Sequence, residues 1–183
     1  MTWARRCIRR MLRPWRPDPV ERLRRMGMQI GRNLSLQPGV VLDESHAWLI
    51  DIGDDVTLAP RVVVLAHDAS TKRALGYTRI GTVSIGDRVF VGGNALILPG
   101  VRIGSDSIIG AGSVVTSDVS PGQVCVGNPA RAVASTADYL KKRQEQLLRE
   151  PRFGREYTVG GEVTRAMKAD MVGRLAERFG FVE

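Results

Sequence analysis

A six-residue period runs without interruption from Ile85 to Ser120 and restricts the possible folds more than any other feature of this chain. Each hexad opens with an aliphatic residue, and the next residue is Gly in four of the six hexads. The opening residues are Ile85, Val91, Ile97, Ile103, Ile109 and Val115. Six residues advance an α-helix by about 1.7 turns, which would scatter these side chains around it. The period therefore predicts a β-solenoid, with aliphatic side chains pointing inward and Gly or Asn tolerating the corner angles.

The same spacing appears in two earlier blocks of the chain, each in its own phase. The blocks contain Ile30, Leu36 and Leu42, and then Ile52, Leu58 and Val64. Three hexads form one coil, so the blocks and the later hexads together predict about four coils. The register is broken by Asp43–Asp51 and by Ala66–Ser84. Insertions in a solenoid leave the core as loops, often on the binding face, so we expect the longer loop, with His67, to be functional.

Basic charge is confined to one end of the chain. The net charge of +8 resides in residues 1–32, where ten Arg face only Asp18 and Glu21. Apolar residues recur at helical spacing from Trp3 to Trp15, and Arg fills the opposite face. This pattern predicts a cationic amphipathic helix over residues 3–16. Either it lies on an anionic membrane surface, or it packs on the solenoid or on a neighbouring subunit. We expect no nucleic-acid partner.

The pattern divides the chain into three predicted parts. Residues 1–29 form the basic arm, residues 30–134 the hexapeptide-repeat domain with loop 66–84, and residues 135–183 a helical extension. A capping box at Ser135 predicts a helix that ends before Pro151. An i, i+4 apolar stripe predicts a last helix from Val163 to Phe179.

Cysteine usage and hydropathy indicate the compartment. Cys7 and Cys125 lie in unrelated segments, which favours two unpaired, reduced thiols. No run of about 18 apolar residues is present, and no apolar segment follows the basic start as in a secretory signal. We therefore expect a cytoplasmic protein. The basic arm suggests the alternative that the protein attaches peripherally to the inner face of the membrane.

The chain contains only two histidines, which limits the candidates for a general base. His67 opens the long insertion beside Asp68, and His46 lies in the short one. A neutral imidazole can accept a proton from an alcohol as the alcohol attacks an acyl donor. No Ser or Cys lies in a nucleophile motif, which favours direct transfer in a ternary complex. Two histidines also argue against the three-histidine zinc site of a γ-type carbonic anhydrase, so no metal is expected.

Residues 30–134 resemble the hexapeptide-repeat acyltransferases, specifically the maltose/galactoside and xenobiotic O-acetyltransferase branch. The resemblance rests on IGDDVTLAP (Ile52–Pro60), on the His67-Asp68 pair, and on the hexads of Val83–Arg131 that end in GNPAR. It implies a left-handed parallel β-helix assembled as a homotrimer. It also implies that acetyl-CoA binds in the cleft between neighbouring subunits, with His67 as the general base.

The resemblance carries over to further positions of this chain. Those implied to contact acetyl-CoA are Phe90, Gly92, Gly93, Ala111, Gly112, Thr116 and Arg131. An alternative explanation also stays open, in which the glycines are only corner residues of the solenoid and Arg131 is only a solvated charge. The candidates on the acceptor side are Asp43, Glu44, His46 and Asp68. The Asn that the sugar-specific branch carries near positions 40–43 is absent, so acceptor recognition is expected to differ from that of maltose or galactoside.

The predicted function is transfer of an acetyl group from acetyl-CoA to a sugar hydroxyl, in synthesis of a surface polysaccharide or a lipid-linked glycan. Two alternatives stay open. One is acetylation of an amino sugar, amino acid or antibiotic, and the other is a non-catalytic assembly subunit built on the same repeats.

Overall fold

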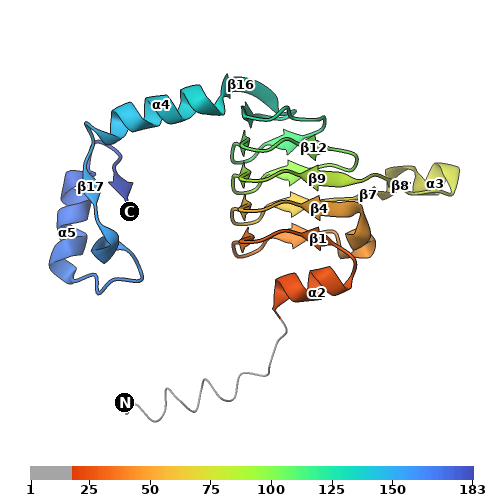
Figure 1. The fold of residues 1–183 in the computed structure, drawn as a ribbon, viewed down its shortest axis with the longest axis horizontal. Coiled ribbons are helices and arrows are strands. Elements are labelled where there is room, and N and C mark those ends of the chain that lie inside the picture. The colour runs from red at the N-terminus through yellow and green to blue at the C-terminus, as the bar shows by residue number, and fades with distance from the viewer. Residues whose placement is uncertain (1–17) are drawn as a thin grey trace, which may run out of the picture. The chain divides into compact units, whose positions relative to one another are not determined.

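A computed structural model describes residues 18–183 of the chain (Figure 1). The chain divides into two compact units, Met1–Ala134 and Ser135–Glu183. The amphipathic helix predicted over residues 3–16 lies outside the described residues. Within residues 18–183, no helix combines the length and the apolar character needed to cross a membrane.

The first unit is built from two- to five-residue strands, and all but those of one hairpin form three stacked sheets. Sheet A contains β1 (Gln29–Ile30), β4 (Ile50–Ile52), β9 (Val83–Ile85) and β12 (Arg102–Ile103). Sheet B contains β2 (Ser35–Leu36), β5 (Thr57–Leu58), β10 (Phe90–Val91), β13 (Ile108–Ile109), β15 (Gln123–Val126) and β16 (Arg131–Ser135). Sheet C contains β3 (Val41–Leu42), β6 (Val63–Val64), β11 (Leu96–Ile97) and β14 (Val114–Val115). The chain visits sheets A, B and C in rotation, and Figure 1 shows the strands of sheet A stacked one above another.

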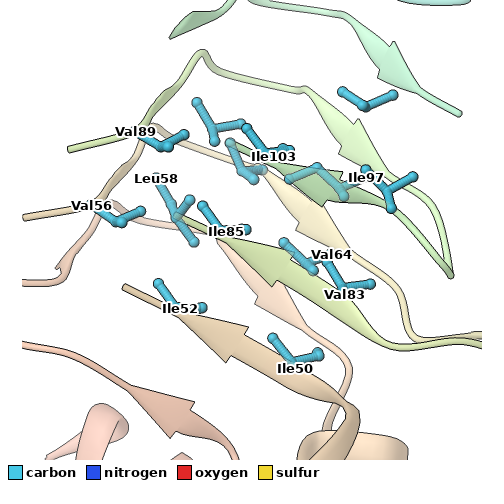
Figure 2. Packing of buried hydrophobic residues seen from close by; sticks show 14 of the residues in the cluster. Ile50, Ile52, Val56, Leu58, Val64, Val83, Ile85, Val89, Ile97 and Ile103 are labelled. Atoms are coloured by element: carbon cyan, nitrogen blue, oxygen red, sulfur yellow. The ribbon is translucent and has the colours of Figure 1, made fainter. Parts of the chain in front are cut away.

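The strands pair in parallel, in the register that the hexads predict. Ile103 partners Ile85 in sheet A, one full coil of three hexads further along the chain. The six opening aliphatics of the regular hexads are each at most 2 % exposed. Figure 2 shows several of them pointing into the same interior, together with Ile52 and Leu58 of the earlier blocks. Burying this apolar surface stabilises the stack, at roughly 25 cal/mol per Å². The parallel sheets and the inward-facing side chains are confirmed.

The glycine that follows the opening aliphatic residue in four of the six hexads has a different physical cause from the one predicted. Gly86 does not have a positive φ; instead, a Cβ on it would lie 2.6 Å from the backbone nitrogen of Ser105 in the next coil. The positive φ angles fall further along the corner, on residues such as Asp55 and Asp106. Asp and Asn tolerate this conformation better than most residues. The small residue is therefore required by the close approach of neighbouring coils.

Helix α2 (Pro19–Arg25) covers the β1 end of the first unit. Asp18 caps it, and its Leu23 is buried in the same core cluster as Met28. The Arg24 guanidinium donates to the carbonyl oxygens of Ile30 and Gly31, both at 2.9 Å. This part of the predicted basic arm is thus packed on the first coil.

The two predicted register breaks form structured insertions. The shorter contains the 3₁₀ helix η1 (Glu44–Leu49). The longer forms an antiparallel hairpin of β7 (His67–Asp68) and β8 (Arg79–Ile80), which encloses η2 (Ala69–Thr71) and α3 (Lys72–Leu75). Figure 1 shows this hairpin extending away from the stacked strands of sheet A.

The second unit contains α4 (Thr136–Leu147) and α5 (Arg165–Arg174). The predicted cap of α4 is present, because Ser135 Oγ accepts a hydrogen bond from the backbone nitrogen of Asp138 at 3.0 Å. Helix α5 ends earlier than predicted. Beyond it, β18 (Phe181–Val182) pairs in parallel with β17 (Arg152–Phe153). The 3₁₀ helix η3 (Arg155–Tyr157) lies between β17 and α5 in the chain. Phe181 and Val182, which follow the predicted helix, thus form one strand of a small two-stranded sheet.

Candidate active site

Two neighbouring strands of sheet C bring Asp43 and His67 together. Strands β3 and β6 pair in parallel, with Leu42 opposite Val64. The pairing continues one residue further, because the backbone nitrogen of Asp43 donates to the carbonyl oxygen of Val64 at 3.0 Å. Asp43 therefore lies beside the segment that follows β6, which contains Ala66 and His67. Residues 24 positions apart in sequence become neighbours through the stacking of coils.

The carboxylate of Asp43 is buried and fully engaged. Its side chain is 2 % exposed, and Oδ2 accepts a hydrogen bond from the backbone nitrogen of Ala66 at 3.0 Å. Oδ1 accepts from the backbone nitrogen of Ser45 at 3.1 Å, and Oδ2 also contacts Nδ1 of His67. Burial by itself would raise the pKa of Asp43, but the hydrogen bonds from His67, Ala66 and Ser45 outweigh it and lower the pKa below its ordinary value. The group is thus a carboxylate at neutral pH.

The ionised Asp43 determines which His67 nitrogen carries the proton. A carboxylate can only accept hydrogen bonds, so Nδ1 of His67 must be the donor, which leaves the lone pair of Nε2 free. The His67 side chain is 33 % exposed, so solvent or an acceptor can reach it. Its backbone is held by pairing with Ile80 in the hairpin. An imidazole held in this way can accept a proton at Nε2 from a group that reaches it.

His46 and Trp48 extend the site. The ring centroid of His46 lies 5.1 Å from that of His67 and 5.6 Å from that of Trp48. Trp48 is 62 % exposed, whereas Nδ1 of His46 is buried and has no hydrogen-bond partner among the described residues. These three rings line one edge of the site beside the Asp43 carboxylate.

The other two acceptor candidates have local roles instead. Glu44 forms an ion pair with Arg22 on α2. Asp68 caps η2 and accepts from the backbone nitrogen of Ser70 at 2.9 Å, a hydrogen bond that lowers the pKa of Asp68. Of the four residues, the structure brings Asp43 and His46 to His67 and leaves Glu44 and Asp68 occupied elsewhere.

The sequence reasoning named Asp43 only as an acceptor contact and missed its pairing with His67. The signal was present in the hexad phases. Leu42 and Val64 both open the third hexad of a coil, so they belong to the same inward column. The residue after each must therefore be adjacent in space, which places Asp43 beside the start of the long insertion.

Four of the predicted donor contacts meet at one corner, between sheets B and C. Gly92 and Gly93 follow β10, and the backbone nitrogen of Gly112 donates to the carbonyl oxygen of Gly93 at 2.9 Å. A Cβ on Gly92 would lie 2.5 Å from the nitrogen of Ala111, so coil stacking alone requires Gly there. Gly112 has φ +70°, and a Cβ on it would meet open space. This corner therefore leaves exposed backbone that a ligand could approach closely.

The remaining donor candidates lie around the same unit. Phe90, 45 % exposed, faces outward from sheet B. Thr116 follows β14 and Arg131 begins β16, and both are exposed. The glycine corner precedes the strands of sheet C, while His67 follows one of them. Within one chain, the glycine corner and the predicted base thus lie at opposite ends of sheet C, and Thr116 lies at the end where His67 is.

Comparisons with known proteins agree with this architecture. The pattern of the family described as Bacterial transferase hexapeptide (six repeats) matches residues 82–117. Galactoside O-acetyltransferase of Escherichia coli (strain K12) is 34% identical over 127 residues, which cover 68% of this chain and 62% of that protein. The chain thus spans less than two thirds of the length of this relative.

Solved structures extend the comparison. A galactoside acetyltransferase in complex with coenzyme A is 30% identical, with a TM-score of 0.55 over 69% of this chain and 76% of that one. A maltose O-acetyltransferase from Clostridium difficile 630 is 28% identical, with a TM-score of 0.53 over 73% of this chain and 84% of that one. The period, the parallel sheets and these similarities lead to one conclusion: the chain belongs to the hexapeptide-repeat transferase family, in the branch of the galactoside and maltose O-acetyltransferases.

Proposed function

We propose that this protein transfers an acetyl group from acetyl-CoA to a hydroxyl group, with His67 as the general base. The observation that carries the proposal is the buried Asp43 carboxylate, which holds Nδ1 of a partly exposed His67. An imidazole fixed in this way presents Nε2 to a substrate in one orientation and one tautomer. A purely structural histidine would not need a buried, ionised partner.

The chemistry follows from that orientation. A hydroxyl placed against Nε2 of His67 loses its proton to this nitrogen while its oxygen attacks the acetyl carbonyl carbon. The C–S bond of the thioester breaks, and the proton held by His67 passes to the departing sulfur. The carboxylate of Asp43 stabilises the imidazolium while it holds that proton. The products are an acetyl ester and free coenzyme A, with no covalent enzyme intermediate.

Acetyl-CoA supplies the acyl group, and the residues of the glycine corner fit a ligand of its kind. Gly93, Ala111 and Gly112 present backbone with little side chain, and the open space beside Gly112 allows close approach. Exposed Phe90 offers an apolar surface, and exposed Arg131 can pair with phosphate. The similar galactoside acetyltransferase solved in complex with coenzyme A supports acetyl-CoA as the donor.

Assembly into a homotrimer of left-handed β-helices accounts for the separation of the two parts of the site. The glycine corner and His67 lie at opposite ends of sheet C in one chain, so a cleft between neighbouring copies can combine the corner of one with the imidazole of the other. The outward positions of sheet C are all apolar: Val41, Val63, Leu96 and Val114. Such a column favours contact with another subunit.

A sugar hydroxyl is the acceptor that the relatives favour, since they are galactoside and maltose O-acetyltransferases. Exposed Trp48 near the His67–His46 edge offers a flat surface of the kind that packs against a sugar ring. The basic segment of residues 1–32 suits an acceptor attached to an anionic membrane, such as a lipid-linked glycan.

The test is acceptor-dependent release of the coenzyme A thiol from acetyl-CoA, with sugars, an amino sugar and serine as acceptors. We expect turnover with at least one sugar, and a loss of about 10²–10⁴-fold in kcat for His67→Ala. Asp43→Asn should lower kcat more than it changes KM, because the amide favours the wrong imidazole tautomer. Melting temperatures of both variants check that they fold. Wild-type rates in His67→Ala would refute the proposal, and a preference for the amino group of serine or an amino sugar would replace O-acetylation by N-acetylation.

A further inference from the structure

Asp43, His46 and His67 form a compact set of metal-binding side chains. Each offers one ligand atom, and these atoms lie within 4.8 Å of one another. Two imidazoles and one carboxylate, with further positions open to solvent, form a donor set that suits zinc and neighbouring divalent transition metals. Mg²⁺ and Ca²⁺ prefer all-oxygen sites, so this donor set disfavours them.

A second observation points to a ligand at this place. Nδ1 of His46 is buried and has no hydrogen-bond partner among the described residues. A buried polar atom without a partner costs about 1–3 kcal/mol, so an unexplained one suggests a missing partner. A coordinated ion supplies one, because the lone pair of a neutral imidazole binds a metal directly.

The local backbone holds His46 in this position. His46 interrupts η1 with φ −134° and ψ 43°, angles outside the helical region. Asp43 caps the same short helix by accepting from the backbone nitrogen of Ser45. His67 approaches from the hairpin, and its ring centroid lies 5.1 Å from that of His46. Two separate insertions of the first unit thus place their histidines against one carboxylate.

We propose that Asp43, His46 and His67 bind a divalent transition-metal ion such as Zn²⁺, and that the bound ion inhibits acetyl transfer. The proposal that a metal binds depends on the donor set and is independent of the proposed function. The inhibition rests on the proposed function. Because Oδ2 of Asp43 contacts Nδ1 of His67, an ion shared by the two binds Nδ1, and the ring proton then resides on Nε2, which can no longer accept a proton from the hydroxyl. The site is therefore regulatory, and the reaction itself has no need of the ion.

The experiment uses Co²⁺ as a spectroscopic probe on the full chain, treated first with a chelator. A Cys7→Ser background removes a competing thiol, and the chain contains no histidines besides these two. We expect saturable visible absorption bands at one Co²⁺ per chain, displacement by Zn²⁺, and a higher melting temperature with metal. His46→Ala should weaken binding by at least about tenfold. Glu44→Gln, a carboxylate of the same helix that faces Arg22, is the matched control and should bind as wild type.

The outcomes separate the two parts of the proposal. The metal site is wrong if no saturable binding occurs below about 1 mM Co²⁺, or if His46→Ala and His67→Ala both bind as tightly as wild type while remaining folded. If the site binds, Zn²⁺ should inhibit wild-type transfer at concentrations that leave His46→Ala near its own metal-free rate. Stoichiometric binding without inhibition would support the site and contradict the role of His67 as the base.

Discussion

At the scale of single residues, the site depends on one buried carboxylate. Asp43 accepts two backbone hydrogen bonds besides its contact with His67, so its orientation does not depend on the imidazole. Several exposed acids of the first unit behave differently. They form ion pairs with arginines at the corners of neighbouring coils, as Asp106 does with Arg88 at 2.7 Å. Such exposed pairs contribute little to stability individually, but they are sensitive to pH and salt.

The Asp106–Arg88 pair should make the stability of the folded protein depend on pH in the acid range. The hydrogen bond from Arg88 lowers the pKa of Asp106 below its ordinary value of 3.8. A group whose pKa is lower in the folded state than in the unfolded state stabilises the folded protein at pH values above its ordinary pKa. This contribution is lost as the pH falls through the folded-state pKa. Asp106→Asn keeps a residue that tolerates φ +61° but removes the charge.

Melting curves of wild type and Asp106→Asn provide the measurement. Wild type should melt at the higher temperature at pH 7, and the gap should narrow as the pH falls below the ordinary aspartate pKa. High salt at pH 7 should narrow it as well. A gap that stays constant in acid would show that the charge of Asp106 does not contribute.

At the scale of elements, the hexad pattern predicts those features of the fold that depend only on the spacing of residues along the chain. The inward aliphatics, the parallel pairing in coils of three hexads and the positions of both insertions follow from a period that only a coil of short strands accommodates. The left-handed sense of the coil stays a prediction.

Features that depend on angles or on tertiary contact were less accessible from the sequence. The strand of Phe181 and Val182 after α5 depends on pairing with Arg152 and Phe153, which no local pattern predicts. The hexad phases place Asp43 beside the residues that follow Val64, but the Asp43–His67 pair was missed because both residues belong to insertions that the repeat does not describe. The reason for the hexad glycines was missed because a period reveals positions and leaves φ angles and close approaches undetermined.

Two alanine substitutions separate close approach from backbone conformation. A Cβ at Gly86 would lie 2.6 Å from the nitrogen of Ser105, while at Gly100, with φ +89°, it would meet nothing within 4 Å. Gly86→Ala should therefore force the coils apart and cost about 3 kcal/mol. Gly100→Ala should cost about 1 kcal/mol, from the left-handed conformation alone. Denaturant titration measures both free energies of unfolding, and an equal or reversed order would contradict the role given to coil stacking.

At the scale of the whole molecule, two outer faces of the first unit differ in character. The outward positions of sheet A are polar: Gln29, Asp51, Ser84 and Arg102. Those of sheet C are apolar, from Val41 to Val114, and this face lies between the glycine corner and His67. The asymmetry selects sheet C as the contact between copies in the proposed trimer.

Substitution with Glu on the two faces tests that assignment. Leu96→Glu places a charge on the sheet C face, where burial against another subunit would be costly. Ser84→Glu is the matched control on sheet A. Sedimentation should give three times the chain mass of 20.1 kDa for wild type and Ser84→Glu, and the single-chain mass for Leu96→Glu. Dissociation by Ser84→Glu and not by Leu96→Glu would place the interface elsewhere.

The central claim is that Asp43 fixes His67 with Nδ1 protonated and Nε2 free to accept a proton. Nitrogen-15 NMR of histidine-labelled protein, treated with chelator and held at a pH where His67 is neutral, measures this tautomer directly. His46→Gln assigns the second histidine. We expect the Nδ1–H tautomer in wild type and its loss in Asp43→Asn. An Nε2–H tautomer in wild type, or a tautomer unchanged by Asp43→Asn, would contradict it.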